Sequence, residues 1–120
     1  MNAGRKYANG ARFERKVRDW LSEELLDAYV QRSPGSKSKV DVFVCRKKSL
    51  GCSHVMFIQC KTGDVKLERL KGELVELARV ARMAGASAWA AWNYHGGFFL
   101  APVKWNGEVN MQAKRQCPWQ

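Results

Sequence analysis

The chain has 120 residues, of which 46% are hydrophobic, and a formal net charge of +10 at neutral pH. This length supports one domain with a single core, and this apolar content excludes an intrinsically disordered chain. No run of about 18 apolar residues is present, which excludes a membrane-spanning helix. The N-terminal residues lack the apolar segment of a secretory signal. We therefore expect a cytoplasmic protein whose four cysteines are reduced.

The positive charge is concentrated in two segments. Residues 1–18 contain six basic residues and one acidic residue, and residues 31–48 contain the same numbers. A cationic surface interrupted by single acidic residues favours a polyanionic partner, and nucleic acid is the common one. We expect the phosphate-contacting side chains to be Arg5, Lys6, Arg12, Arg15, Lys37, Lys39, Arg46, Lys47 and Lys48.

Residues 9–26 predict an amphipathic helix, because apolar residues recur at every fourth position from Phe13 to Leu25. Glu14 lies on the apolar stripe of this helix, while most of its other charged residues point toward water. A carboxylate on the buried side of a helix is seldom without a partner. Two interpretations stay open for Glu14: a salt bridge with a neighbouring base, or a place in a functional site.

The rest of the chain predicts further strands and a second helix. Strands are expected at residues 28–32, 40–45, 54–62, 87–94 and 98–101, and a helix at residues 67–81. The order helix, three strands, helix, two strands indicates an α/β fold with a central mixed five-stranded sheet and a helix on each face. We take residues 1–105 as the domain and residues 106–120 as a tail that packs on it or extends from it.

The strand at residues 54–62 is apolar on both faces, which is typical of a buried central strand. Gln59 and Lys61 point to one face near its end, and Cys60 points to the other. A buried lysine is costly unless an anion meets it. If Asp41 lies on the neighbouring strand, its carboxylate converges with Gln59 and Lys61. Oxygen ligands from Asp41, the Gln59 side chain and a backbone carbonyl suit Mg²⁺.

Such a site could hydrolyse a phosphodiester. The metal would activate a water molecule and polarise the phosphate. Lys61 would balance the charge of the pentavalent phosphate or hold the attacking water.

Asp41 followed by Gln59-Cys60-Lys61 resembles the metal site of the PD-(D/E)xK, restriction-endonuclease-like nucleases. The wider pattern is similar to the archaeal and phage Holliday-junction resolvases. This resemblance covers about residues 8–105, and it rests on the segments GARFERKVRDWL, RSPGSKSKVDVFV, FIQCKTG and GASAWAAW…GGFFLAPVKW. It implies a restriction-endonuclease-like fold.

The resemblance also implies roles for single residues. Glu14, Asp41, Gln59 and Lys61 would take the catalytic positions. The first three of these would be the ligands of Mg²⁺, for which Mn²⁺ could substitute.

The loop before Asp41 also has implied roles. Ser36 falls where the family has an active-site serine in its mobile loop, with Ser33 and Ser38 close enough to be alternatives. Arg32 and the basic residues of the loop would contact the junction.

The implied activity is Mg²⁺-dependent resolution of four-way DNA junctions by paired cleavage. Two opposed cuts require two sites, so we expect a symmetric homodimer that pairs through the apolar strands of residues 87–101. The resolvases usually carry glutamate where this chain has Gln59, and glutamine at that position resembles the Mrr-like branch of the superfamily. Two alternatives therefore stay open: an Mrr-like or repair endonuclease on duplex DNA, and a catalytically silent nucleic-acid-binding module.

Overall fold

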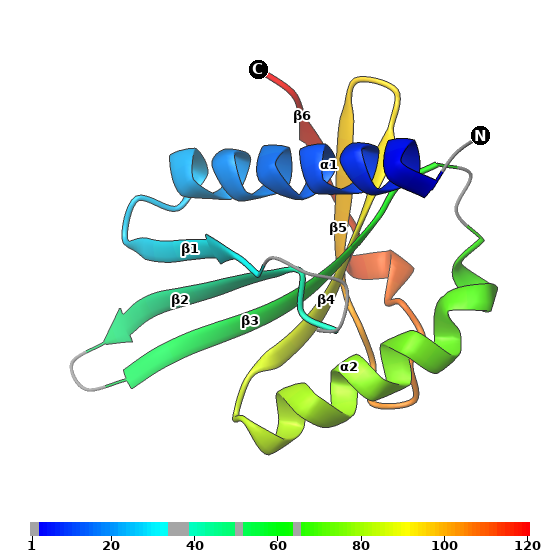
Figure 1. Cartoon of the computed structure of the whole chain (residues 1–120). Helices are drawn as coiled ribbons and strands as arrows, with labels where there is room; N and C mark the ends of the chain where they lie inside the picture. The colour runs from blue at the N-terminus through cyan, green and yellow to red at the C-terminus, as the bar shows by residue number, and fades with distance from the viewer. Residues whose placement is uncertain (1–2, 34–38, 50–51, 64–65) are drawn as a thin grey trace.

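The computed structural model describes residues 3–33, 39–49, 52–63 and 66–120, with the side chains of residues 9–33, 39–47, 54–63 and 66–120. In this part of the chain each of the two α-helices is followed by strands (Figure 1). In chain order the elements are α1 (Ala3–Glu24), β1 (Ala28–Arg32), β2 (Val42–Ser49), β3 (Cys52–Lys61), α2 (Lys71–Met83), β4 (Ser87–Tyr94), β5 (Gly97–Pro102) and β6 (Arg115–Pro118). The 3-10 turns Leu67–Leu70 and Met111–Ala113 precede α2 and β6.

All of these strands form one sheet in the order β1-β2-β3-β4-β5-β6. Neighbouring strands are antiparallel except β3 and β4, which are parallel. A parallel pair needs a crossover connection, and α2 is that connection. The mixed α/β architecture expected from the sequence is therefore confirmed. The expected strand count was wrong, because the sheet has six strands rather than five.

The additional strand, β6, comes from the C-terminal segment. It pairs with β5, where Gly97 allows a close approach because a Cβ atom there would collide with the Cys117 carbonyl oxygen. Its end is also tied to α1, since the Trp20 indole Nε1 donates a 2.9 Å hydrogen bond to the Pro118 carbonyl oxygen. Only Cys117 of this strand is buried. A four-residue strand with one buried side chain has no period that sequence reasoning could detect.

The helices cover opposite faces of the sheet (Figure 1). On the α1 face, Val17 and Leu21 pack with Ile58 of β3 and Phe98 of β5. On the α2 face, the buried residues Leu74, Leu77, Ala78 and Ala81 pack against small residues of β4. Because side chains alternate along a strand, β3 sends Met56, Ile58 and Cys60 to the α1 face and Phe57 to the α2 face. The expectation that β3 is a central strand, apolar on both faces, is confirmed.

The segment expected to form the dimer contact lies mostly inside the domain. Ala88, Ala90, Ala91, Phe98, Leu100 and Ala101 are buried in the two cores. Trp92, Tyr94 and Phe99 are half-buried, and the rings of Trp92 and Tyr94 pack at a tilt against Phe99, with centroid distances of 5.5 Å and 4.6 Å. Most of the apolar surface attributed to a partner subunit is thus covered by the protein's own helices.

Within the described residues, neither helix combines the length and apolar content needed to cross a membrane.

Candidate active site

Asp41 lies immediately before β2, rather than within a strand as the sequence suggested. Both of its backbone polar groups join the sheet: its N–H donates to the Ile58 carbonyl (2.9 Å), and its carbonyl accepts from the Ser33 N–H (2.8 Å). Its carboxylate Oδ2 accepts a 2.8 Å hydrogen bond from the backbone N–H of Cys60. The backbone therefore holds the Asp41 carboxylate beside the Gln59-Cys60-Lys61 segment, where the sequence predicted convergence.

The environment of Asp41 is strongly charged. The pKa of its carboxyl group is raised from 3.8 to about 6, mainly by burial, and the hydrogen bond from Cys60 partly opposes that rise. Glu14 and Glu73 contribute to the rise, and Lys61 opposes it. These three side chains are therefore close enough to Asp41 to influence its ionisation. Such a perturbed carboxyl group is typical of a functional site.

Gln59 and Lys61 point to the α2 face and meet the same carboxylate. The Gln59 Nε2 atom donates a 3.1 Å hydrogen bond to Glu73 Oε2, and the Lys61 ammonium lies 2.8 Å from that oxygen. Gln59 is 6% exposed, and among the described residues it is the one polar side chain that is buried. Its Oε1 atom has no hydrogen-bond partner among the described residues. A buried amide oxygen without a partner costs about 1–3 kcal/mol, which requires an explanation.

Glu73 was missed by the sequence analysis. It lies in the first turn of α2, where the partial positive charge of the helix N-terminus favours a carboxylate. Its interaction with Lys61 lowers the pKa of its carboxyl group. A signal was present in the sequence, because Glu73 follows Leu70 by three residues and precedes Leu77 by four. It therefore sits on the apolar stripe of its helix, by the same criterion that singled out Glu14.

Glu14 adopts the salt-bridged arrangement that the sequence left open. Its Oε1 atom lies 3.0 Å from Arg32 Nε, and the two side chains are 18% and 16% exposed. The Arg32 guanidinium, expected to contact the junction, is thus engaged inside the protein. Glu14 influences Asp41 through its charge, but the structure brings it into direct contact with Arg32 rather than with Asp41.

The oxygen donors at this site fit a hard divalent cation. Across the described residues, no three His, Cys, Asp or Glu side chains converge tightly enough to hold a metal by themselves. Mg²⁺ does not need such a cage, because it is commonly held by one or two carboxylates together with waters and substrate phosphates. The Asp41 carboxylate and the unpartnered Gln59 Oε1 provide oxygen donors of the required kind.

Several expected DNA contacts are on the surface. The side chains of Arg12, Arg15, Lys39, Arg46 and Lys47 are exposed, and Arg46 is paired with Asp27 at 3.2 Å. The side chains of Arg5, Lys6, Lys37 and Lys48, together with Ser36 and Ser38, lie outside the described residues.

A surface groove of about 670 Å³ lies between the basic helix α1 and the residues that follow β3. It is lined by Arg12 and Lys16 of α1 and by Thr62 and Gly63, which directly follow Lys61. Trp119 also lines it, with the Lys16 ammonium 4.2 Å from the centre of its ring. Cations beside an aromatic ring can contact both the backbone and the bases of a nucleic-acid strand. The groove thus leads from the exposed face of α1 to the end of β3.

Comparisons with known proteins show a family and a similar fold. A family model described as archaeal Holliday junction resolvase (hjc) matches residues 5–117. Among solved structures, a similar one is Hjc from Archaeoglobus fulgidus, described as a Holliday junction resolvase from an archaeal hyperthermophile. It aligns with a TM-score of 0.51 and 22% identity over 78% of this chain and 72% of that chain. At this identity the structural likeness concerns the fold alone. The search of curated proteins found no significant match.

Proposed function

The chain belongs to the archaeal Holliday junction resolvase family, and from this premise we propose that it resolves four-way DNA junctions by Mg²⁺-dependent, paired cleavage. Family membership makes it a nuclease that acts on junction DNA. The proposal adds the metal, the two opposed cuts and the residues that carry them. We further place the enzyme in the cytoplasm, with access to DNA.

One observation carries the assignment of the site. The Cys60 N–H donates to the Asp41 carboxylate, so Asp41 lies beside the strand end that bears Gln59 and Lys61. Asp41 and the Gln59 Oε1 atom would hold the cation, which when bound would lower the pKa of a water molecule and polarise the phosphate. Asp41 must be ionised for this role, and in the metal-free protein its pKa of about 6 leaves the carboxyl group about half protonated at pH 6.

Lys61 would bind the reacting phosphate. Its side chain is 35% exposed, so the ammonium can reach a phosphate that approaches from solvent. An ammonium group beside a pentavalent phosphorus stabilises the negative charge that accumulates on the oxygens in the transition state. The groove lined by Arg12 and Lys16 lies next to Thr62 and Gly63, and it would hold the DNA strand beyond the reacting phosphate.

Paired cleavage requires two such sites, because one domain offers one. A symmetric homodimer places two identical sites at a constant separation, which suits a four-way junction. The two subunits could pair through the half-buried aromatic cluster of Trp92, Tyr94 and Phe99, which is part of the described apolar surface.

The proposal is tested by cleavage of a labelled four-way junction over a range of Mg²⁺ concentrations, alongside linear duplex and single-stranded DNA. Lys61→Ala should reduce cleavage at least about a hundredfold while junction affinity falls little. Lys71→Ala is the matched control, because Lys71 is also a lysine paired with a glutamate (Glu108, 3.6 Å), but it lies on the outer surface of α2. Cleavage by Lys61→Ala within about tenfold of the wild-type rate would contradict the assigned role.

The same assay separates the alternatives. Equal cleavage of linear duplex would indicate a duplex endonuclease. Junction binding without cleavage at any divalent-metal concentration would indicate a silent binding module.

A further inference from the structure

The proposed metal site has one carboxylate fewer than its chemistry favours. Position 59 offers a neutral amide, which provides an oxygen donor but no negative charge. Glu14, the other acidic residue expected at the site, is neutralised by Arg32 in a mostly buried ion pair. Asp41 is therefore the one acid assigned from the sequence that can give the cation a negatively charged ligand. A divalent cation is attracted more strongly when a second carboxylate is within reach.

Glu73 is in the position to supply that carboxylate. Its Oε2 atom contacts both Gln59 and Lys61, and its charge acts on Asp41. Its Oε1 atom accepts no hydrogen bond from the described residues. The side chain is 42% exposed, so an incoming ion can reach it. Glu73 is thus a half-engaged carboxylate at the edge of the site.

The orphaned oxygen of Gln59 points independently to a ligand. The Gln59 side chain is fixed by its amide nitrogen, which donates to Glu73, while the amide oxygen of the same group is buried and unpaired. Folded proteins rarely leave such an oxygen unsatisfied unless something fills the place. A cation bound between Glu73 and Asp41 would satisfy it.

We propose that Glu73 is a metal-binding residue of this enzyme, which replaces from α2 the carboxylate that β3 lacks at Gln59. The inference rests on the proposed function, since it concerns the cation which that function requires. In the metal-free protein Glu73 holds Lys61 and Gln59 in place. If Glu73 held the cation instead, the Lys61 ammonium would lose its partner and could bind the phosphate.

The arrangement also conserves charge at the site. Asp41 and Glu73 provide two negative charges and Lys61 one positive charge. A glutamate at position 59, as the resolvases usually have, would give the same sum with Asp41 and Lys61. Moving the carboxylate from the strand to the helix therefore preserves the attraction for a divalent ion.

Mn²⁺ binding to the full chain without DNA tests this inference, measured by electron paramagnetic resonance of the free ion and by calorimetry. Glu73→Gln should weaken Mn²⁺ binding about tenfold or more, because it removes one charge and keeps the size of the side chain. The double variant Gln59→Glu with Glu73→Gln should bind Mn²⁺ within about tenfold of the wild type, because the carboxylate returns on the strand.

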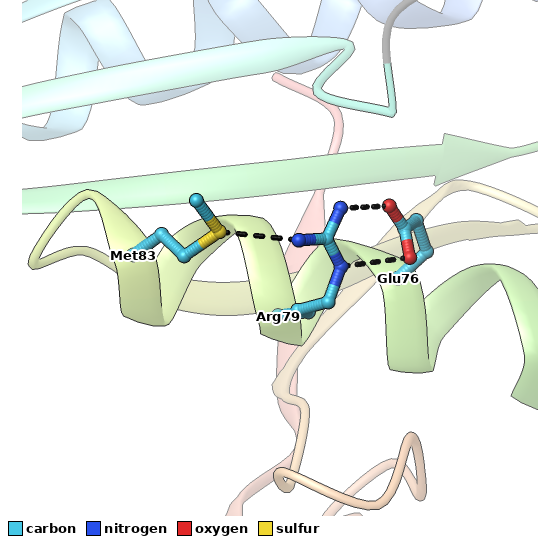
Figure 2. A network of polar contacts seen from close by, with 3 residues as sticks. All are labelled: Glu76, Arg79 and Met83. Atoms are coloured by element: carbon cyan, nitrogen blue, oxygen red, sulfur yellow. Dashed lines mark hydrogen bonds and ion pairs between the residues drawn. The ribbon is translucent and has the colours of Figure 1, made fainter.

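Glu76→Gln is the matched control. Glu76 lies three residues further along α2, and Arg79 holds its carboxylate through Nε at 3.1 Å and through a second guanidinium nitrogen, while a third nitrogen of Arg79 contacts the sulfur of Met83 (Figure 2). This network lies on the helix itself. Glu76→Gln should therefore leave Mn²⁺ binding unchanged, although it removes the same charge from the same helix.

The outcomes separate the inference from the function on which it rests. If the wild type binds Mn²⁺ and cleaves with it, but Glu73→Gln binds Mn²⁺ equally well, Glu73 only positions Lys61 and the inference is wrong. If the wild type neither binds nor cleaves with any divalent metal, both the inference and the proposed function fail. Should Glu73→Gln not fold, Glu73→Asp decides, because it keeps the charge and the pairing partner of Lys61 but withdraws the oxygens by one methylene: weaker Mn²⁺ binding supports the inference, and unchanged binding overturns it.

Discussion

Replacing Asp41 by asparagine should stabilise the metal-free protein at neutral pH while it removes cleavage. In the folded chain the pKa of Asp41 is raised from 3.8 to about 6, mainly by burial. Each unit of such a shift corresponds to about 1.4 kcal/mol, so the ionised carboxylate destabilises the fold by about 3 kcal/mol. Asparagine keeps an oxygen that can accept the Cys60 N–H and removes the buried charge. The predicted gain is therefore electrostatic.

The predicted gain depends on pH. Because the folded pKa lies above the unfolded one, the folded chain binds more protons than the unfolded chain between about pH 4 and pH 6. The free energy of unfolding of the wild type therefore falls as the pH rises through this window, and the full loss is present above about pH 6. Asp41→Asn has no such titration. Its advantage over the wild type should grow by about 2 kcal/mol between about pH 4.5 and pH 7.5.

Urea unfolding followed by tryptophan fluorescence at several pH values measures this difference. Asp19→Asn is the control, because Asp19 is 62% exposed, so the same substitution there removes no buried charge. Adding Mg²⁺ should stabilise the wild type more than Asp41→Asn, because only the wild type retains the charged ligand. A difference between Asp41→Asn and wild type that stays constant from acid to neutral pH would refute the reasoning.

Three further outcomes are expected. Glu14→Gln should lower the free energy of unfolding by about 1–3 kcal/mol, because it leaves the mostly buried Arg32 guanidinium without its counter-charge; an equally stable variant in urea would contradict this. The logarithm of junction affinity should fall linearly with the logarithm of salt concentration, and Arg12→Ala should flatten that slope by about one unit; an unchanged slope would remove Arg12 from the phosphate contacts. Sedimentation at micromolar concentration should show a homodimer, and a monomer that still makes paired cuts would exclude this arrangement.

Much of the site was predictable because it depends on strand alternation. Once residues 54–62 are taken as a central strand, Gln59 and Lys61 must share a face and Cys60 must take the other. Asp41 was conspicuous because aspartate is rare near the start of an apolar β-branched segment. The antiparallel pairing of β2 with β3 then places it beside Cys60. These inferences need only local periodicity and one strand pairing.

The remaining features depend on tertiary contacts that periodicity does not report. Glu73 reaches the site because α2 crosses back over the sheet between β3 and β4, and the depth and angle of that crossing are set by packing. Arg32 reaches Glu14 because β1 lies under α1, which no spacing in the sequence reveals. In both cases a charged side chain near an apolar stripe was the available signal, and identifying its partner required the fold.

The exchange of a strand carboxylate for a helix carboxylate has a physical consequence for the metal-free protein. A glutamate at position 59 would be almost fully buried, since Gln59 is 6% exposed, and it would lie close to an Asp41 whose pKa is already about 6. Two buried carboxylates in one site raise each other's pKa, so in the metal-free protein one of them would stay protonated to a higher pH, and an incoming cation would have to displace that proton. Glu73 avoids this because its side chain is 42% exposed and pairs with Lys61, an interaction that lowers its pKa. The helix carboxylate therefore stays ionised in the metal-free protein at pH values where a strand carboxylate would be partly protonated, and the amide at Gln59 can accept burial without carrying a charge.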